Sequence, residues 1–417
     1  MLQSVGGLQM FRALRYHDYR WLWISGIGEF AGVSIQAFSL AWLVLEISGG
    51  SFAQLGFMTF LRGLGMMVFL PLGGVAADRF DRRILLGGSY LLMGATFAIV
   101  ATLIMLDLIQ LWHAYAASFI TGTVRAFNSP ARYALVRDLV PERNVMNAVA
   151  LIFVVETMAL MVGAPIAGGI IDLASTGVAF YLVGFCFLLA TFSLFMIQRE
   201  PRRSEFGRVA MGRDLLEGIK YVASSRPVRA VIILGLALAF IGSPHNHMLP
   251  AFGKEVLELG PATASLLPMA TGIGALTGNV ALAALGDVRR KNILWLWLIL
   301  VFITSLALFA VTPWFGIALV LLFLVGLGEM TFVSMGVALL QLLTPREFIG
   351  RIMSIWGYAG SLMYLGSLPM GIVGEMIGLR MTLLGSASVC IALFIALGVA
   401  SPSIRQIAFK ESRRVVP

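Results

Sequence analysis

The sequence predicts an all-α polytopic membrane protein, with twelve transmembrane helices in two pseudo-symmetric six-helix bundles. Three observations predict this fold: an apolar composition, apolar runs of membrane-spanning length, and a repeat that relates the two halves of the chain. Of the 417 residues, 59% are hydrophobic and 12% are charged, whereas about a quarter of the residues in a soluble domain are charged. A soluble chain of this composition would expose large apolar patches. The composition therefore excludes a water-soluble fold.

The apolar residues come in runs that are long enough to cross a bilayer. The segment 84–106, for example, holds no charged residue, and a spanning helix needs about 20 apolar residues. Hydropathy and helix-breaking residues predict twelve spans. They cover residues 21–45, 52–76, 84–106, 111–132, 146–171, 178–198, 229–251, 262–285, 292–312, 314–340, 350–374 and 379–400.

The basic residues lie mainly on one side of these spans. Of the 30 Lys and Arg residues, 26 fall at the chain ends or in the links on that side, and two, Lys254 and Arg380, fall on the other. Because cytoplasmic links carry the excess of positive charge, we expect both termini to be cytoplasmic in a multi-pass protein of the plasma membrane, of the bacterial inner-membrane type. The same clustering explains the net charge of +9 without a nucleic-acid partner, which would need a continuous basic surface.

The longest polar stretch lies near the middle of the chain. It predicts an N-terminal six-helix bundle over 1–198, a cytoplasmic linker over 199–228, and a C-terminal bundle with a cytoplasmic tail over 229–417. Within the linker, residues 213–222 place apolar side chains at helical spacing. This segment is either an amphipathic helix on the inner membrane surface or a solvated linker helix.

The second half of the chain repeats the first at two offsets. At 209 residues, Arg20 falls on Arg229 and Asp78 on Asp287. At 204 residues, further identical pairs are Gly122 with Gly326, Pro141 with Pro345, Pro165 with Pro369 and Cys186 with Cys390. Two parallel six-helix halves are the architecture of one large class of secondary transporter.

The link between the second and third spans carries a recognisable motif. Its residues Gly74, Asp78, Arg79, Arg82 and Arg83 resemble the Gly-x-x-x-Asp-Arg-x-x-Arg-Arg signature of the major facilitator superfamily. Asp81 replaces the usual glycine. This variant, with Asn128-Ser-Pro130-Ala-Arg132 and Glu217-Gly-Ile-Lys-Tyr221, is similar to the branch that contains macrolide-efflux and enterobactin-exporter proteins.

The resemblance implies a gate at the inner end of the spans. Asp78 would face the positive amino-terminal end of the eleventh span, and Arg82 would pair with an acid at the end of the fourth span, for which Asp138 is the candidate. Such contacts contribute about 0.3–2 kcal/mol each, which suits a latch that opens. The alternative is that the basic residues serve only membrane topology.

A second motif, Gly163-Ala-Pro165-Ile-Ala-Gly168-Gly169, lies in the fifth span. It resembles the Gly-Pro-x-x-Gly-Gly element of exporters that exchange substrate against protons, with Ala164 in place of the first glycine. Proline bends a helix and small residues let a neighbouring helix approach. An ordinary tight helix contact is the alternative interpretation.

Five ionisable residues lie inside the predicted spans: Glu29, Arg62, Arg125, Glu156 and Glu329. Such residues are costly in a bilayer and usually functional. The resemblance implies that the first, fourth, seventh and tenth spans line a central cavity, which holds three of them. We hypothesise that Glu29 or Glu329 is a proton-coupling carboxylate whose protonation Arg125 controls. The alternative is a static pair in which Arg125 neutralises Glu29 or Glu156.

The seventh span adds His245, Asn246 and His247 near its outer end. Polar residues at a cavity mouth are favoured over metal ligands, because no cluster with metal-binding spacing accompanies them. No nucleophile–base set or phosphate loop is visible, so neither an enzyme nor a cofactor is expected.

The sequence as a whole favours a monomeric secondary transporter that exports a small amphipathic compound against protons by alternating access. One alternative within the superfamily is an importer or a lysophospholipid flippase. From another class, the chain is a helical receptor or an assembly subunit without transport, which would not need duplicated halves.

Overall fold

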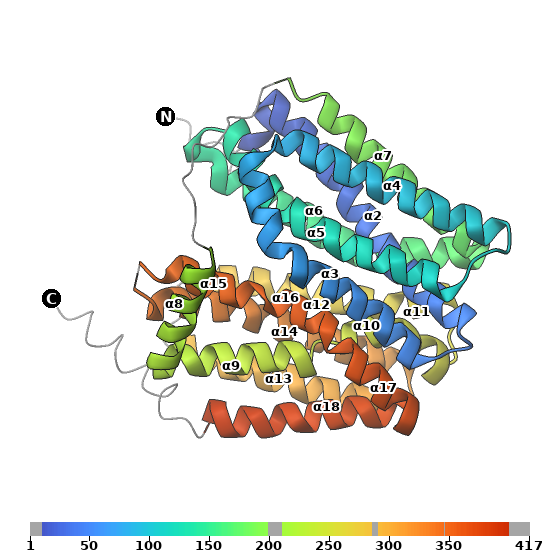
Figure 1. Cartoon of the computed structure of the whole chain (residues 1–417). Coiled ribbons are helices and arrows are strands. Elements are labelled where there is room, and N and C mark those ends of the chain that lie inside the picture. The colour runs from blue at the N-terminus through green and yellow to red at the C-terminus, as the bar shows by residue number, and fades with distance from the viewer. Residues whose placement is uncertain (1–10, 199–210, 286–290, 346, 400–417) are drawn as a thin grey trace, which may run out of the picture. The chain divides into compact units, whose positions relative to one another are not determined.

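The computed structural model describes residues 11–198, 211–285, 291–345 and 347–399, and this part of the chain is helical without a strand (Figure 1). The all-α prediction is confirmed. Residues 286–290, which include the repeat residue Asp287, and the tail beyond 399 lie outside the described residues. The main helices are α2 (His17–Ile47), α3 (Phe52–Arg79), α4 (Arg82–Met105), α5 (Leu111–Leu139), α6 (Glu142–Leu173), α7 (Thr176–Phe195), α8 (Met211–Ser224), α9 (Arg226–Ile241), α10 (His245–Ala251), α11 (Pro261–Ala264), α12 (Leu266–Leu285), α13 (Lys291–Val311), α14 (Phe315–Leu343), α15 (Ile349–Gly357), α16 (Ala359–Leu365), α17 (Ser367–Ile377) and α18 (Leu379–Leu393).

Helices lie over each of the twelve expected spans. In the described residues, ten helical stretches are long and apolar enough to cross a membrane. The fourth and eleventh expected spans are not among the ten. Helix α5 carries several charged and amide side chains, and the eleventh span is divided into α15, α16 and α17 at Tyr358 and Gly366. That these two segments also cross the membrane, which would give twelve crossings in all, therefore stays a prediction.

The helices form two compact units. Unit 1 contains Met1–Ile47, Leu64–Arg208 and Pro261–Ser265, and unit 2 contains Ser48–Gly63, Val209–Gly260 and Leu266–Pro417. Compared with the expected bundles, two short segments are exchanged. The first part of α3 groups with unit 2, and the segment that contains α11 groups with unit 1.

Each unit is held by close helix contacts, and one contact recurs in both. In unit 1 a methyl group added at Gly65 would lie 2.6 Å from the Phe119 carbonyl oxygen, so α3 and α5 approach at their backbones. In unit 2 Gly274 of α12 meets the Phe323 carbonyl of α14 in the same way. Gly274 follows Gly65 by 209 residues and Phe323 follows Phe119 by 204, which are the offsets of the sequence repeat. The pseudo-symmetry therefore extends to backbone packing.

Within unit 2, the first part of α3 packs on α17. Gly56 and Gly371 lie at this contact, where neither has room for a side chain. The Glu375 carboxylate of α17 accepts hydrogen bonds from the Phe52 and Ala53 amides at 2.8 and 3.3 Å and from Ser51 Oγ at 3.2 Å. It thereby satisfies amide groups that the first turn of a helix leaves unpaired, at the helix end that attracts negative charge.

The motif of the fifth span lies inside the continuous helix α6. An added methyl group at Gly163 would collide with Ser34 of α2, and one at Gly168 would collide with the segment at Pro261 and Ser265. Gly169 has no neighbour within 4 Å of such a group. Two of the three glycines are therefore sites of tight helix contact. A role of the motif, including Pro165, in the exchange of substrate against protons stays a prediction.

We predict that Gly163→Ala lowers the thermal stability of the purified protein, since overpacking costs about 1–3 kcal/mol. Gly169→Ala is the matched control, because alanine favours a helix by about 1 kcal/mol over glycine and meets open space there. A melting experiment in detergent measures both variants. Equal melting temperatures for the two variants would contradict the packing of α6 described above.

Candidate functional site

The signature between the second and third expected spans forms the turn between α3 and α4. Helix α3 ends at Arg79 and α4 begins at Arg82. Asp81, the residue that replaces the usual glycine, caps α4 by accepting hydrogen bonds from the Arg83 and Ile84 amides at 2.8 and 3.3 Å. The substitution therefore supplies a helix cap. The side chain of Asp78 lies outside the described residues, and Gly74 faces open space.

Arg82 links three helices of unit 1. Its Nη1 lies 2.5 Å from Asp138 Oδ2 of α5, and its Nε donates to the Ala77 carbonyl of α3 at 3.1 Å. Both side chains of the ion pair are largely buried, with exposures of 10% and 13%. The structure thus brings together the two residues that the signature predicts to pair. The neighbouring Arg83 donates to the Phe195 carbonyl at 2.9 Å, while Arg79 is exposed.

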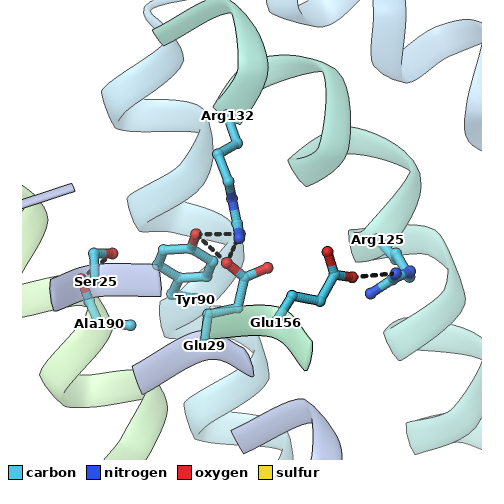
Figure 2. A network of polar contacts seen from close by, with 7 residues as sticks. All are labelled: Ser25, Glu29, Tyr90, Arg125, Arg132, Glu156 and Ala190. Carbon is cyan, nitrogen blue, oxygen red and sulfur yellow. Dashed lines mark hydrogen bonds and ion pairs between the residues drawn. The ribbon is translucent and has the colours of Figure 1, made fainter. Parts of the chain in front are cut away.

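A buried polar triad connects α2, α4 and α5 of unit 1 (Figure 2). Arg132 of α5 forms an ion pair with Glu29 of α2, and Tyr90 of α4 donates its hydroxyl to Glu29 Oε2 at 2.6 Å. Arg132 Nη2 also donates to the Tyr90 oxygen at 2.9 Å. All three residues are buried, so the negative charge is neutralised where it lies. The cation that holds Glu29 is therefore Arg132 rather than the expected Arg125.

Arg125 has a different described acidic partner. Its Nη2 lies 3.4 Å from Glu156 Oε1 of α6, and the two side chains are 34% and 22% exposed (Figure 2). This geometry matches the static-pair interpretation for Glu156. A pair at this distance and exposure is weaker than the buried triad beside it.

Glu329 follows Arg125 by 204 residues, so it is the repeat-equivalent position in unit 2. Its environment is different. It lies on α14 with 1% exposure. Asn246 of α10 donates to its Oε2 at 2.8 Å, and its Oε1 has no hydrogen-bond partner among the described residues. Asn246 follows the break between α9 and α10, where the chain turns at Gly242, Ser243 and Pro244. Glu329 is thus tied to the interrupted seventh span.

Two of the remaining expected residues, Arg62 and His247, meet at an aromatic side chain that the sequence does not single out. The His247 ring stacks on Tyr364 of α16 with ring centroids 4.5 Å apart, and the Arg62 guanidinium lies 5.1 Å from the same Tyr364 ring. His245 is buried, with Nδ1 2.8 Å from the Gly242 carbonyl. The described residues contain no group of three His, Cys, Asp or Glu side chains with metal-binding geometry.

Sequence reasoning misses three residues of these clusters: Arg132, Tyr90 and Tyr364. Arg132 stands at the expected end of the fourth span, but α5 continues to Leu139 and carries it inside the unit. The only signal for it is its place in the Asn128-Ser-Pro130-Ala-Arg132 motif. The two tyrosines resemble ordinary apolar packing residues in a spanning helix.

We predict that Arg82→Gln destabilises the protein, because removing one partner of a buried ion pair costs about 3–5 kcal/mol. The exposed Arg79→Gln should leave the melting temperature nearly unchanged. If both residues also belong to a gate, both variants lose transport, and only Arg82→Gln loses stability. An Arg82→Gln protein as stable as the parent would show that the Asp138 contact does not support the fold.

Known proteins resemble this chain over most of its length. The profile of the Major Facilitator Superfamily matches residues 22–365. Macrolide efflux protein A of Streptococcus pyogenes is 23% identical over 351 residues, which cover 82% of this chain and 87% of the relative. Enterobactin exporter EntS of Shigella boydii serotype 18 is 28% identical over 317 residues, which cover 73% and 72%.

Solved structures show the same fold. The nucleoside transporter NupG matches with a TM-score of 0.70 at 15% identity, over 92% of this chain and 98% of the other. A bacterial homologue of the iron transporter ferroportin matches with a TM-score of 0.72 at 16% identity, over 92% and 99%. With the signature turn, the repeated packing and the profile match over most of its length, the chain belongs to the Major Facilitator Superfamily.

Proposed function

We propose that this transporter exports a small amphipathic compound, of the drug, macrolide or siderophore-like kind, in exchange for protons and by alternating access. The efflux function of the two relatives supports the direction and the class of substrate. We further propose that the chain acts as a monomer in a bacterial-type inner membrane with both termini in the cytoplasm, as the distribution of its basic residues indicates.

The environment of Glu329 is the observation that carries the proton-coupled mechanism. An ionised carboxylate buried without a counter-charge loses several kcal/mol of hydration, whereas a protonated carboxyl group needs only hydrogen bonds. Asn246 is the only polar partner of Glu329 among the described residues. A proton arriving at Glu329 therefore removes a buried charge. Because Asn246 belongs to the interrupted seventh span, this change acts on a helix break of the kind that lines transporter sites.

Glu29 suits a different role in this proposal. Arg132 already neutralises its carboxylate, and Tyr90 donates a hydrogen bond to it. Glu29 therefore does not need a proton in order to be buried. We assign the Glu29 triad to holding α2, α4 and α5 together. The Arg82–Asp138 pair and the rest of the signature turn are assigned to the inner gate, and Arg125, Glu156, Arg62 and His247 to the polar lining of the substrate path.

A resistance and uptake screen tests the proposed activity. A deletion strain expressing the protein is challenged with macrolides, siderophores and cationic dyes, with and without a protonophore. Export predicts resistance that the protonophore abolishes, and accumulation in inside-out vesicles. Accumulation in right-side-out vesicles instead would establish the importer alternative. Absence of counterflow for every compound would favour a non-transporting receptor or assembly subunit.

We predict that Glu329→Gln reduces proton-driven accumulation by more than about tenfold, within the usual range of a coupling free energy. Glutamine preserves an oxygen for the Asn246 amide but cannot carry the proton. Counterflow of substrate, which needs no net proton movement, should continue. Glu258→Gln, at an exposed position, is the matched control and should behave as the parent. Full proton-driven accumulation in the Glu329→Gln vesicles would remove this residue from the coupling mechanism.

A further inference from the structure

Helix α8, in the segment that links the two halves of the sequence, is docked through one face onto α15 in unit 2 (Figure 1). Glu217 Oε2 lies 2.9 Å from Arg351 Nη1. The rings of Tyr221 and Phe348 stack with centroids 4.6 Å apart and planes inclined by 14°. Between these contacts is Gly218, where an added methyl group would lie 3.2 Å from Arg351 Cβ. The docked face is therefore specific and closely fitted.

The opposite face of α8 is apolar and basic, and its described side chains are exposed. Leu216 and Ile219 are 60% and 51% exposed, and Lys220 and Ala223 are also exposed. Ile219 and Lys220 lie three and four positions after Leu216, and Ala223 lies four and three positions after them. The four residues therefore share one side of the helix. Glu217 is not on this side and is paired with Arg351. The exposed side thus combines two large apolar side chains with a cation.

The position of α8 along the chain limits where this face lies. Helix α8 ends at Ser224, and the spanning stretch Arg226–Val256 begins two residues later. Since consecutive Cα atoms are about 3.8 Å apart, the end of α8 lies within one or two residue lengths of the membrane-spanning helix. Arg226 and Arg229 at this junction are both exposed, and Arg229 donates to the Ala223 carbonyl at 2.8 Å. Positive charge therefore continues from α8 to the start of α9.

We propose that the exposed face of α8 binds anionic phospholipid of the membrane surface. Leu216 and Ile219 enter the boundary between headgroups and acyl chains, while Lys220 and Arg226 contact the anionic headgroups. An apolar face flanked by cations is the pattern of helices that lie in the membrane interface, and basic residues beside a membrane are attracted to anionic lipid. The proposal corresponds to the membrane-surface interpretation of the linker helix, and the solvated linker helix is the alternative that the experiment below tests.

The same docking gives the lipid contact a consequence for α15. Arg351 and Phe348 meet α8 on its docked face while lipid occupies the other face, so α8 lies between lipid and the inner part of the eleventh span. Lipid that orders α8 therefore also restrains α15. This inference concerns regulation and does not depend on which substrate is transported or on proton coupling.

Hydrogen exchange of the full-length protein tests the lipid contact without any transport measurement. Exchange is compared in phosphatidylcholine nanodiscs with and without phosphatidylglycerol. We expect amides of 211–224 to exchange about three- to tenfold more slowly with the anionic lipid, given about 1 kcal/mol per basic residue near such a surface. High salt should remove the difference, because surface charges are screened. Equal exchange in the two lipids would overturn the proposal.

Variants identify the face responsible. Lys220→Gln with Arg226→Gln should abolish the effect of phosphatidylglycerol, and Leu216→Ser with Ile219→Ser should raise exchange in both lipids. The charge-matched control is Arg137→Gln with Arg143→Gln, two exposed cations outside α8, which should retain the lipid effect. Loss of the effect in the control as well would show that bulk positive charge, and not α8, attracts the lipid. Glu217→Gln should loosen α8 and the amides of 349–357 together if α8 restrains α15.

Discussion

The structure depends on the requirement that every charge placed among helices in hydrocarbon has a partner. Glu29 meets this requirement fully through Arg132 and Tyr90, and Arg82 meets it through Asp138 at an end of the same unit. Glu329 meets it only by one amide hydrogen bond within the described residues. The contrast separates fully paired acids, which hold helices together, from a buried acid that has a single amide partner among the described residues. The proposed mechanism follows from this difference in partners more than from the presence of acids in the spans.

Close backbone contact is the second organising feature, and it explains why the repeat persists in a composition dominated by apolar residues. Hydrophobic burial does not drive helices together in lipid, so packing and hydrogen bonds must do so. The glycine–carbonyl contact at Gly65 and Phe119 recurs at Gly274 and Phe323. The repeat that the sequence shows is therefore present in the backbone packing as well.

The sequence predicts the helices and one ion pair well, but not which buried groups meet. Runs of apolar residues locate each expected span, and the signature places Arg82 and Asp138 at helix ends that lie together. The partner of Glu29 is different from expected because hydropathy ends the fourth span at Arg132, whereas α5 continues to Leu139, with Leu135, Val136 and Leu139 buried. Hydropathy also does not fix the rotation of a helix about its axis. For that reason Tyr90 and Tyr364 could not be distinguished from packing residues.

The exchange of segments between the units has a consequence for dissecting the molecule. The boundary within α3 falls between Gly63 and Leu64, and residues 261–265 group with unit 1 although their neighbours on both sides belong to unit 2. A cut in the central segment therefore separates each of these two short segments from the unit with which it groups. Fragments made by opening the central segment would each lack a stretch of helix that only the other fragment encodes. Co-expressed fragments would have to assemble by complementation, and either fragment alone would expose glycine-lined backbone such as that at Gly371.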